Sequence, residues 1–369
     1  MESRWLSSKP IFMVACRAFL GSCVVFVLAT NNSSTLGVDG IREYRVVTNS
    51  FSAEYGLTSG SQVVIVSKGG TNELHGSVFE YLRNSALDAR NFFDYKSIAS
   101  QRRLPLFQRN QFGASLGGPL KKDKTFVFGV FEGVRQHLGV TIIDTVIPPS
   151  AKTDGGAGGV PQIAPVIKPI LALFPDPNLP NNFFTYPAFQ PLTDNYGQAR
   201  VDHIFSSEDS FFVRYTAEDA QLTDPQPYPQ FRNLRSSRNQ FITLSETRIL
   251  SPTLLNTARV SFSRSAPAVD SPSGIIGPQY SFVPGKEFGS ISIGGITSLG
   301  SVATSPSKQK QNIFTYSDDL FYSRGRHSVK LGTLVNHYQQ YLLTQTNSRG
   351  AVSFTDLRSF LLGQPNTYT

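Results

Sequence analysis

The sequence is poor in charged residues, methionine and tryptophan, and it has no cysteine beyond residue 23. Charged side chains make up 16% of the 369 residues, compared with roughly 25% in typical soluble domains. Both cysteines, Cys16 and Cys23, lie near the N-terminus. The rest of the chain can therefore form neither a disulfide framework nor a cysteine metal site, which fits an exported protein.

The sequence also lacks the motifs that carry covalent chemistry. The Lys68-Gly69-Gly70 segment has neither the spacing nor the following helix of a phosphate-binding loop. There is no HExxH motif, EF-hand loop or Gly-x-Ser-x-Gly elbow. The histidines are isolated from one another: His75, His137, His203, His327 and His337. We therefore predict no enzymatic activity, cofactor or metal and assign no catalytic residue; the substrate-binding residues stay unknown.

The formal net charge of +8 has no concentrated basic tail or stripe. A nucleic-acid-binding domain usually gathers its charge in this way. The densest cluster is Lys121, Lys122 and Lys124, which lies in a predicted tight turn. The charge therefore indicates a mildly basic lumen or loop surface, and no nucleic-acid partner is predicted.

Alternation of apolar and polar residues is the main structural signal of the chain. In 109–117 one face carries Phe112, Ala114 and Leu116, while polar or small residues occupy the other. Such period-two alternation predicts strands with unlike faces. The same pattern recurs in 198–205, 211–218, 254–262, 314–322 and 329–336.

Two further features favour a transmembrane barrel wall over a soluble sandwich. Charged residues stand in the middle of the predicted polar faces: Arg200, Asp202, Arg214, Arg259 and Lys330. Short turns, such as 206–210, alternate with long segments at 148–191, rich in Pro, Gly and Asn, and at 265–307, rich in Ser, Gly and Pro. Transmembrane barrels combine short periplasmic turns with long outer loops in this way. A short helix is predicted within 166–174.

We therefore predict an all-β fold: a partial antiparallel transmembrane barrel of about ten strands, counted from His75 and not closed. Its apolar belt should face lipid at Phe112, Leu116, Phe211, Val213, Val260 and Phe262. The alternative is an exported soluble β-sandwich that binds a ligand and buries these residues against a second sheet.

The first 30 residues contain basic residues, an apolar run at 18–29 and a small-residue cleavage pattern. These features predict a signal peptide at 1–30, with a spurious leader as the alternative. The run is too short to span a bilayer as a helix, which needs roughly 20 residues.

Four segments, in order, resemble one family. The stretch 38–94 is similar to the end of the plug domain and the first barrel strand of TonB-dependent outer-membrane receptors, in particular the Oar-like branch. The segments 250–256, 325–332 and 350–363 resemble later strand and turn motifs of the same branch. The resemblance implies that 31–74 is a remnant of the plug and that 75–369 is the N-terminal part of the barrel.

The resemblance also implies a function and partners. Complete family members have 22 strands and a plugged lumen, and they import a ligand with energy from the inner membrane. The expected location is the outer membrane, and the expected partners are its lipid, an extracellular ligand and the inner-membrane energy-transducing complex. The contact motif for that complex is not found in this sequence, so we expect a fragment that is not transport-competent alone. At Gly69-Gly70, a reversal between plug and wall is expected to need φ > 0.

Overall fold

A computed structural model describes residues 38–47, 62–88 and 106–369. The predicted signal peptide at 1–30 lies outside the described residues, as does much of the predicted plug region. None of the described helices is long and apolar enough to span a membrane.

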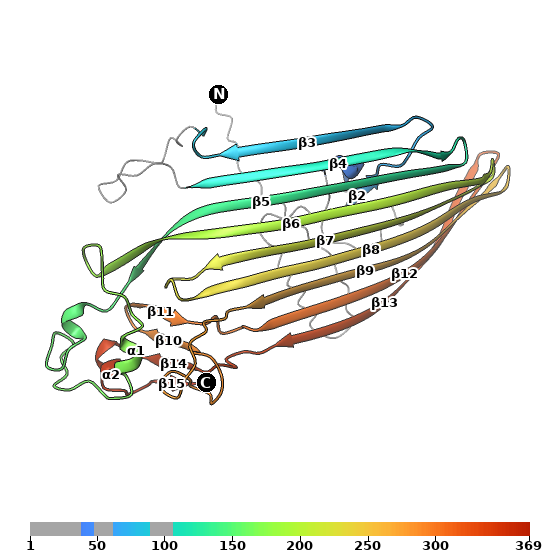
Figure 1. Cartoon of the computed structure of the whole chain (residues 1–369). Coiled ribbons are helices and arrows are strands. Elements are labelled where there is room, and N and C mark those ends of the chain that lie inside the picture. Colours follow the sequence, from blue (N-terminus) through green and yellow to red (C-terminus); the bar gives the residue numbers. More distant parts are fainter. Residues whose placement is uncertain (1–37, 48–61, 89–105) are drawn as a thin grey trace, which may run out of the picture.

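Nine strands form one antiparallel sheet, which we call the wall (Figure 1). Its order is β3-β4-β5-β6-β7-β8-β9-β12-β13, so the chain builds it by adding each strand beside the previous one. The strands are β3 (His75–Asn84), β4 (Phe107–Lys121), β5 (Thr125–Thr145), β6 (Phe183–Ser206), β7 (Asp209–Pro225), β8 (Arg232–Ser251), β9 (Leu254–Asp270), β12 (Ser307–Arg324) and β13 (His327–Thr344). Among the described residues the wall does not close, because β3 and β13 remain edges. The predicted open, antiparallel all-β architecture is confirmed.

Tight turns join the strands at one end of the wall. They lie at 122–124, 207–208, 252–253 and 325–326. Two residues in these turns adopt the left-handed conformation, Asp123 with φ 61° and Gly325 with φ 61°. Glycine tolerates this conformation best, followed by Asp and Asn, whose short side chains can form local hydrogen bonds. The turns at 122–124, 207–208 and 325–326 fall within turns predicted from sequence, whereas the one at 252–253 was not predicted. All the long connections described lie at the opposite end.

The first long connection is shorter than predicted. It covers 146–182, because 183–191 belongs to β6 and pairs with β5. Strand β7 reaches β6 only from Leu192 onward. The outer stretch of β6 is therefore an edge on that side, where Pro187 and Pro191 need not donate a ladder hydrogen bond. The predicted loop at 148–191 is wrong in its second part for this reason.

The second long connection also contains more structure than predicted. Strand β9 continues to Asp270, and two short strands follow within the segment predicted as loop at 265–307. A separate four-stranded sheet has the order β11-β10-β14-β15. Its strands are β10 (Ser290–Ile293), β11 (Ile296–Gly300), β14 (Ala351–Phe354) and β15 (Thr367–Tyr368). Residues 350–363 thus form β14 and helix α2 (Leu357–Leu361) outside the wall.

The connections 146–182, 226–231, 271–306 and 345–369 pack together into a compact unit that we call the loop lobe. It also holds a 3-10 helix (Pro149–Ala151) and α1 (Lys168–Leu171), the latter within the predicted 166–174. Eighteen buried hydrophobic residues form its core, with Tyr228, Phe288 and Phe360 fully buried. The described part of the wall has only a three-residue buried cluster on one face (Phe128, Val130 and Tyr196). The dry core of the described molecule therefore sits in its loops.

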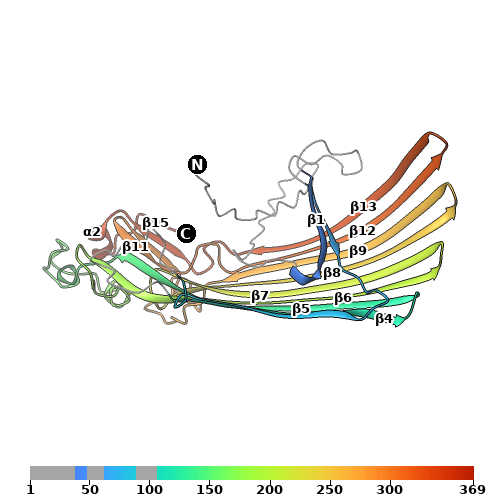
Figure 2. The ribbon, with the colours of Figure 1, turned by 90° about the horizontal axis from the view of Figure 1, so that it is seen from above.

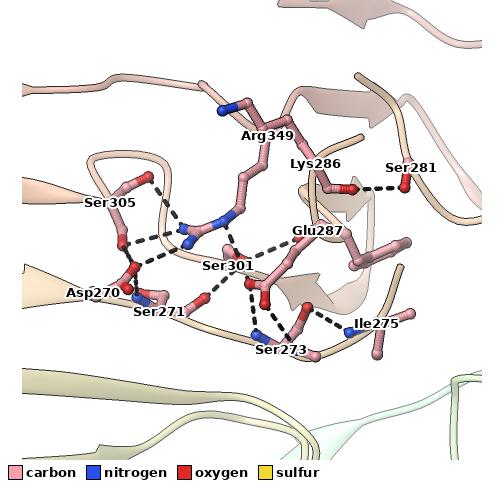
Figure 3. A network of polar contacts seen from close by, with 12 residues as sticks. Asp270, Ser271, Ser273, Ile275, Ser281, Lys286, Glu287, Ser301, Ser305 and Arg349 are labelled. Carbon is pink, nitrogen blue, oxygen red and sulfur yellow. Dashed lines mark hydrogen bonds and ion pairs between the residues drawn. The ribbon is translucent and has the colours of Figure 1, made fainter. Parts of the chain in front are cut away.

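A polar network ties the loop lobe to the wall (Figure 3). The Arg349 guanidinium, with its side chain only 13% exposed, donates to Asp270 Oδ1 at the end of β9 over 2.9 Å. It also lies 3.7 Å from Glu287 Oε2. Ser301 Oγ donates to the carbonyl oxygens of Ser271 and Phe288. Because an almost buried guanidinium needs such partners, this network fixes the lobe on the strand ends.

The wall is curved, and a hairpin lies on its concave side (Figure 2). The hairpin consists of β1 (Ile41–Val47) and β2 (Gln62–Ser67), which pair antiparallel. A 3-10 helix (Val38–Gly40) precedes β1 and contacts β4 and β5.

Candidate functional site on the concave face

The start of the hairpin is anchored to the concave face through Asp39. Its carboxylate accepts hydrogen bonds from Ser77 and Ser115 and pairs with Lys68 Nζ at 2.8 Å. Its backbone N–H donates to Glu132 Oε1 over 2.9 Å. Burial alone would raise the pKa of Asp39, but the hydrogen bonds from Lys68, Ser115 and Ser77 and the charge of Lys68 lower it to about 2. The carboxylate is therefore held ionised as the centre of the anchor.

A second anchor joins the end of the hairpin to β6. Arg200 Nη1 donates to Ser67 Oγ over 2.9 Å. The same guanidinium binds Asp202 in bidentate fashion, with Nη2 to Oδ1 at 2.7 Å and Nε to Oδ2 at 2.9 Å. Bidentate pairs of this kind fix geometry as well as adding energy. The two anchors hold the hairpin in one orientation across the wall.

The chain then crosses onto the wall at Gly69-Gly70. Neither glycine has a positive φ, so the expectation of a left-handed reversal is wrong. A Cβ on Gly70 would lie 2.5 Å from the carbonyl oxygen of Val127, and one on Gly69 would lie 3.1 Å from Asp202 Oδ2. The glycines are needed because the backbone passes directly against β5 and the side chains of β6.

The predicted charged residues share the concave face. The cross-strand register places Arg214 opposite Arg200, and Arg259 and Lys330 on the same side of their strands. Since Arg200 bonds to the hairpin, this side is the concave one. The sequence prediction of a charged inner face is confirmed.

Farther from the turns, the concave face carries buried polar groups that are not fully partnered. Glu132, Tyr196, Glu218 and Asn239 lie side by side on four consecutive strands. Asn239 Nδ2 donates to Glu218 Oε2 over 2.9 Å. Several buried atoms have no hydrogen-bond partner among the described residues: Gln136 Oε1, Asp194 Oδ1, Gln198 Nε2, Glu218 Oε1 and Asn239 Oδ1. Because unpaired buried polar atoms are costly, this face fits water or a polar filling, and no apolar partner sheet.

The convex face carries the predicted apolar belt. Leu116 is 61% exposed and Val260 is 46% exposed, while Phe211 is half-buried between neighbours on the same face. No described sheet packs over them. The prediction that these side chains face outward is confirmed.

The belt ends along a row of polar residues that pair across neighbouring strands at slightly different levels. The pairs are Asn110 with Arg135, Asn195 with Asp219, Gln240 with Arg264, Arg264 with Asn312, and Asn312 with Gln339. Hydrogen bonds connect part of this row, with Arg264 Nε to Asn312 Oδ1 at 2.8 Å. The ten residues of β6 between Asn195 and Ser206 have the length of a transmembrane β-strand, about 9–11 residues.

The loop lobe has a surface groove that sequence reasoning did not assign. Its volume is about 710 Å³, and its apolar floor includes Phe174. Two ion pairs border it, Lys152–Asp176 at 2.7 Å and Lys168–Asp154 at 3.0 Å. The backbone N–H of Ile163 and then Lys168 lower the pKa of Asp154. No sequence motif predicts this groove, because its walls come together only when residues 152–176 fold onto the core of the loop lobe.

Within the described ranges, no three or more His, Cys, Asp or Glu side chains converge into a group that could hold a metal ion. His75 and His203 each form a hydrogen bond with a threonine, Thr71 and Thr125 respectively.

The chain is similar to known outer-membrane proteins. A family model described as outer membrane beta barrel domain matches residues 66–369. The TonB-dependent transporter Oar of Myxococcus xanthus is 31% identical over 115 residues, which are 29% of this chain and 11% of that protein. The crystal structure of the outer membrane transporter YddB from Escherichia coli matches with a TM-score of 0.54 and 10% identity, over 87% of this chain and 37% of that one. The chain therefore spans well under half of either relative.

Proposed function

Because the chain belongs to the outer membrane β-barrel domain family, we propose that it is part of a TonB-dependent receptor that imports a ligand across the outer membrane. The observation that carries the proposal is the division of the wall into two faces. The convex face exposes an apolar belt of transmembrane length, and the concave face holds a hairpin through charged groups. A lipid-facing wall around a filled polar lumen has these properties.

The anchored hairpin supports the assignment of 31–74 to the end of a plug. Its polar contacts lie on the same concave face as the buried groups that lack described partners. More plug would supply donors and acceptors to such groups. In this proposal the inner-membrane energy-transducing complex acts on that plug, and the ligand first meets the groove and exposed surface of the loop lobe.

The strand count supports the proposal that this wall is one part of a larger barrel. Nine antiparallel strands leave β3 and β13 running in the same direction. A second copy placed edge to edge would therefore pair them in parallel, whereas antiparallel closure needs an odd number of additional strands. Bacterial single-chain barrels have an even number of strands, so nine strands do not make a complete one. The chain alone is not transport-competent.

The competing function is a soluble, exported β-sandwich that binds a ligand. A sandwich would bury the convex belt against a second sheet, whereas Leu116 and Val260 are exposed.

Fractionation of cells that produce the chain tests the proposal. We expect recovery with the outer membrane, extraction only by detergent, and heat-dependent migration on a gel. Recovery in the soluble fraction without detergent would refute the membrane proposal and favour the sandwich.

A further inference from the structure

Four basic side chains gather on the convex face, one in the polar row and three just beyond it. They are Arg264 of the row itself, together with Arg238, Lys308 and Lys310. The register places Arg238 opposite Ala266, and Lys308 opposite Ala268. The residues therefore come from β8, β9 and β12, three adjacent strands.

The middle strand gives this cluster a small-residue floor. On β9 the positions that follow Arg264 on the convex face are Ala266 and Ala268. Neighbouring strands lie about 4.7–4.9 Å apart and alternate residues of one strand about 6.8 Å apart. The long side chains of β8 and β12 can therefore lean over the alanines from both sides, leaving a shallow cationic cradle about two strand spacings wide.

The cations of the cradle lack carboxylate partners. Arg238, Lys308 and Lys310 are exposed, and none of the four forms an ion pair among the described residues. The Arg264 Nε donates to the neutral Asn312, and its guanidinium lies over the Phe262 ring. Asp219 lies opposite Arg238 and is the nearest carboxylate in register, but the two side chains do not form an ion pair. Arg264, Lys308 and Lys310 have only neutral residues opposite them in register, so three cations without an opposite carboxylate, and Arg238 beside them, face outward within four residue positions along β9.

That depth is where lipid headgroups lie. The apolar belt ends at the polar row, and the cradle begins at the same row on the side of the long connections. Arginine and lysine bind phosphate through charge-assisted hydrogen bonds, and long basic side chains at a membrane boundary keep their charges at headgroup level.

We propose that Arg238, Arg264, Lys308 and Lys310 form a binding site for the phosphate group of an outer-leaflet lipid. The inference rests on the proposed function, since it needs the long connections to point out of the cell. The bound lipid would seal the outer rim of the wall against the membrane and hold β8, β9 and β12 together at the base of the loop lobe.

The test is a binding titration of fluorescent lipid A, a phosphorylated glycolipid, into the detergent-solubilised full chain. The patch variant carries Arg238→Gln, Lys308→Gln and Lys310→Gln. The control variant carries Lys121→Gln, Lys122→Gln and Lys124→Gln, which removes the same charge from exposed lysines at the other end of the wall. Circular dichroism and heat-dependent migration establish that both variants fold as the unmodified chain does.

We expect the patch variant to bind lipid A about a hundredfold more weakly, since it lacks three basic residues and each basic residue near an anionic surface contributes about fivefold in affinity. The control should bind as the unmodified chain does. Equal weakening in both variants, or no weakening in the patch variant, would overturn the proposal. Displacement of lipid A by inorganic phosphate as readily as by unlabelled lipid A would also overturn it, in favour of a soluble anion.

These outcomes are distinct from failure of the proposed function. A chain that remains in the outer membrane but shows no effect of the patch variant loses only the lipid site. A chain recovered as a soluble protein loses the membrane assignment whatever its affinity for lipid A.

Discussion

Adjacent residues on β9 offer a direct test of the two faces of the wall. Val260 belongs to the convex belt, and Ser261 follows it at nearly the same depth on the concave side. Arginine at the bilayer midplane on a lipid-facing position costs about 2–4 kcal/mol. Val260 lies near the middle of the belt, between the turn at 252–253 and Arg264, so we expect Val260→Arg to destabilise the wall by about that amount.

Ser261→Arg is the matched control. Its face already carries Arg259 and Arg214, so a further guanidinium there stays in a polar environment. Some charge repulsion is expected, but it is reduced by solvent, and the cost should stay below about 1 kcal/mol. A difference of about 2 kcal/mol between the variants corresponds to roughly thirtyfold in the unfolding equilibrium constant.

The measurement is guanidinium-induced unfolding in lipid bilayers, followed by circular dichroism. The single tryptophan, Trp5, lies in the predicted leader, so tryptophan fluorescence is unsuited to reporting on the wall. The reasoning fails if Ser261→Arg lowers the free energy of unfolding as much as Val260→Arg does. That result would mean that the lipid-facing and lumen-facing sides have been exchanged.

Three further predictions concern the anchor, the crossing and the lobe. The pKa of Asp39 is lowered to about 2 in the folded chain, so its ionised carboxylate stabilises the anchored hairpin by about 1–2 kcal/mol above about pH 4. This stabilisation is lost as the pH falls from about 4 to 2, so amide exchange in β1 and β2 should become faster over that window. The Asp39→Asn variant should show no such pH dependence. Gly70→Ala should displace the hairpin and raise its protease sensitivity, because the new Cβ would lie 2.5 Å from the Val127 carbonyl oxygen. Gly197→Ala is the control and should have no such effect, because its Cβ would meet nothing within 4 Å. Equal protease sensitivity in the two variants would contradict the steric argument. Phe288→Ala should destabilise the loop lobe by about 3–5 kcal/mol, which amide exchange would detect as faster exchange in the lobe. If the substitution accelerated exchange in the wall as much as in the lobe, the lobe would have no separate core.

Local sequence was enough to predict which residues of the wall face lipid and which face the lumen. Side chains on a strand alternate with period two, so Leu116 and Val260 on one face, and Arg200 and Arg259 on the other, could be assigned without knowing strand neighbours. The turns at 122–124 and 325–326 could be predicted in the same way, because their polar and glycine residues interrupt the alternation of apolar and polar side chains over a few positions.

Other features depend on contacts between distant segments, and sequence reasoning missed or misread them. The prolines of 183–191 indicated a loop, yet the segment is a strand because β7 leaves one of its sides unpaired there. The glycines at 69 and 70 indicated a left-handed turn, but their reason is the proximity of Val127 in another strand. No pattern in the sequence predicted the groove beside Lys152 and Asp176.

The sequence by itself determined the all-β character of the chain, the two unlike faces of its strands and the family it resembles, because all three are carried by short-range patterns. Tertiary structure alone decided that the loops condense into a lobe with its own core, and that cations from β8, β9 and β12 share one face of three adjacent strands. The physical reason is register. Which residues become neighbours across strands is set by pairing and packing among segments far apart in the chain, and that information is not local.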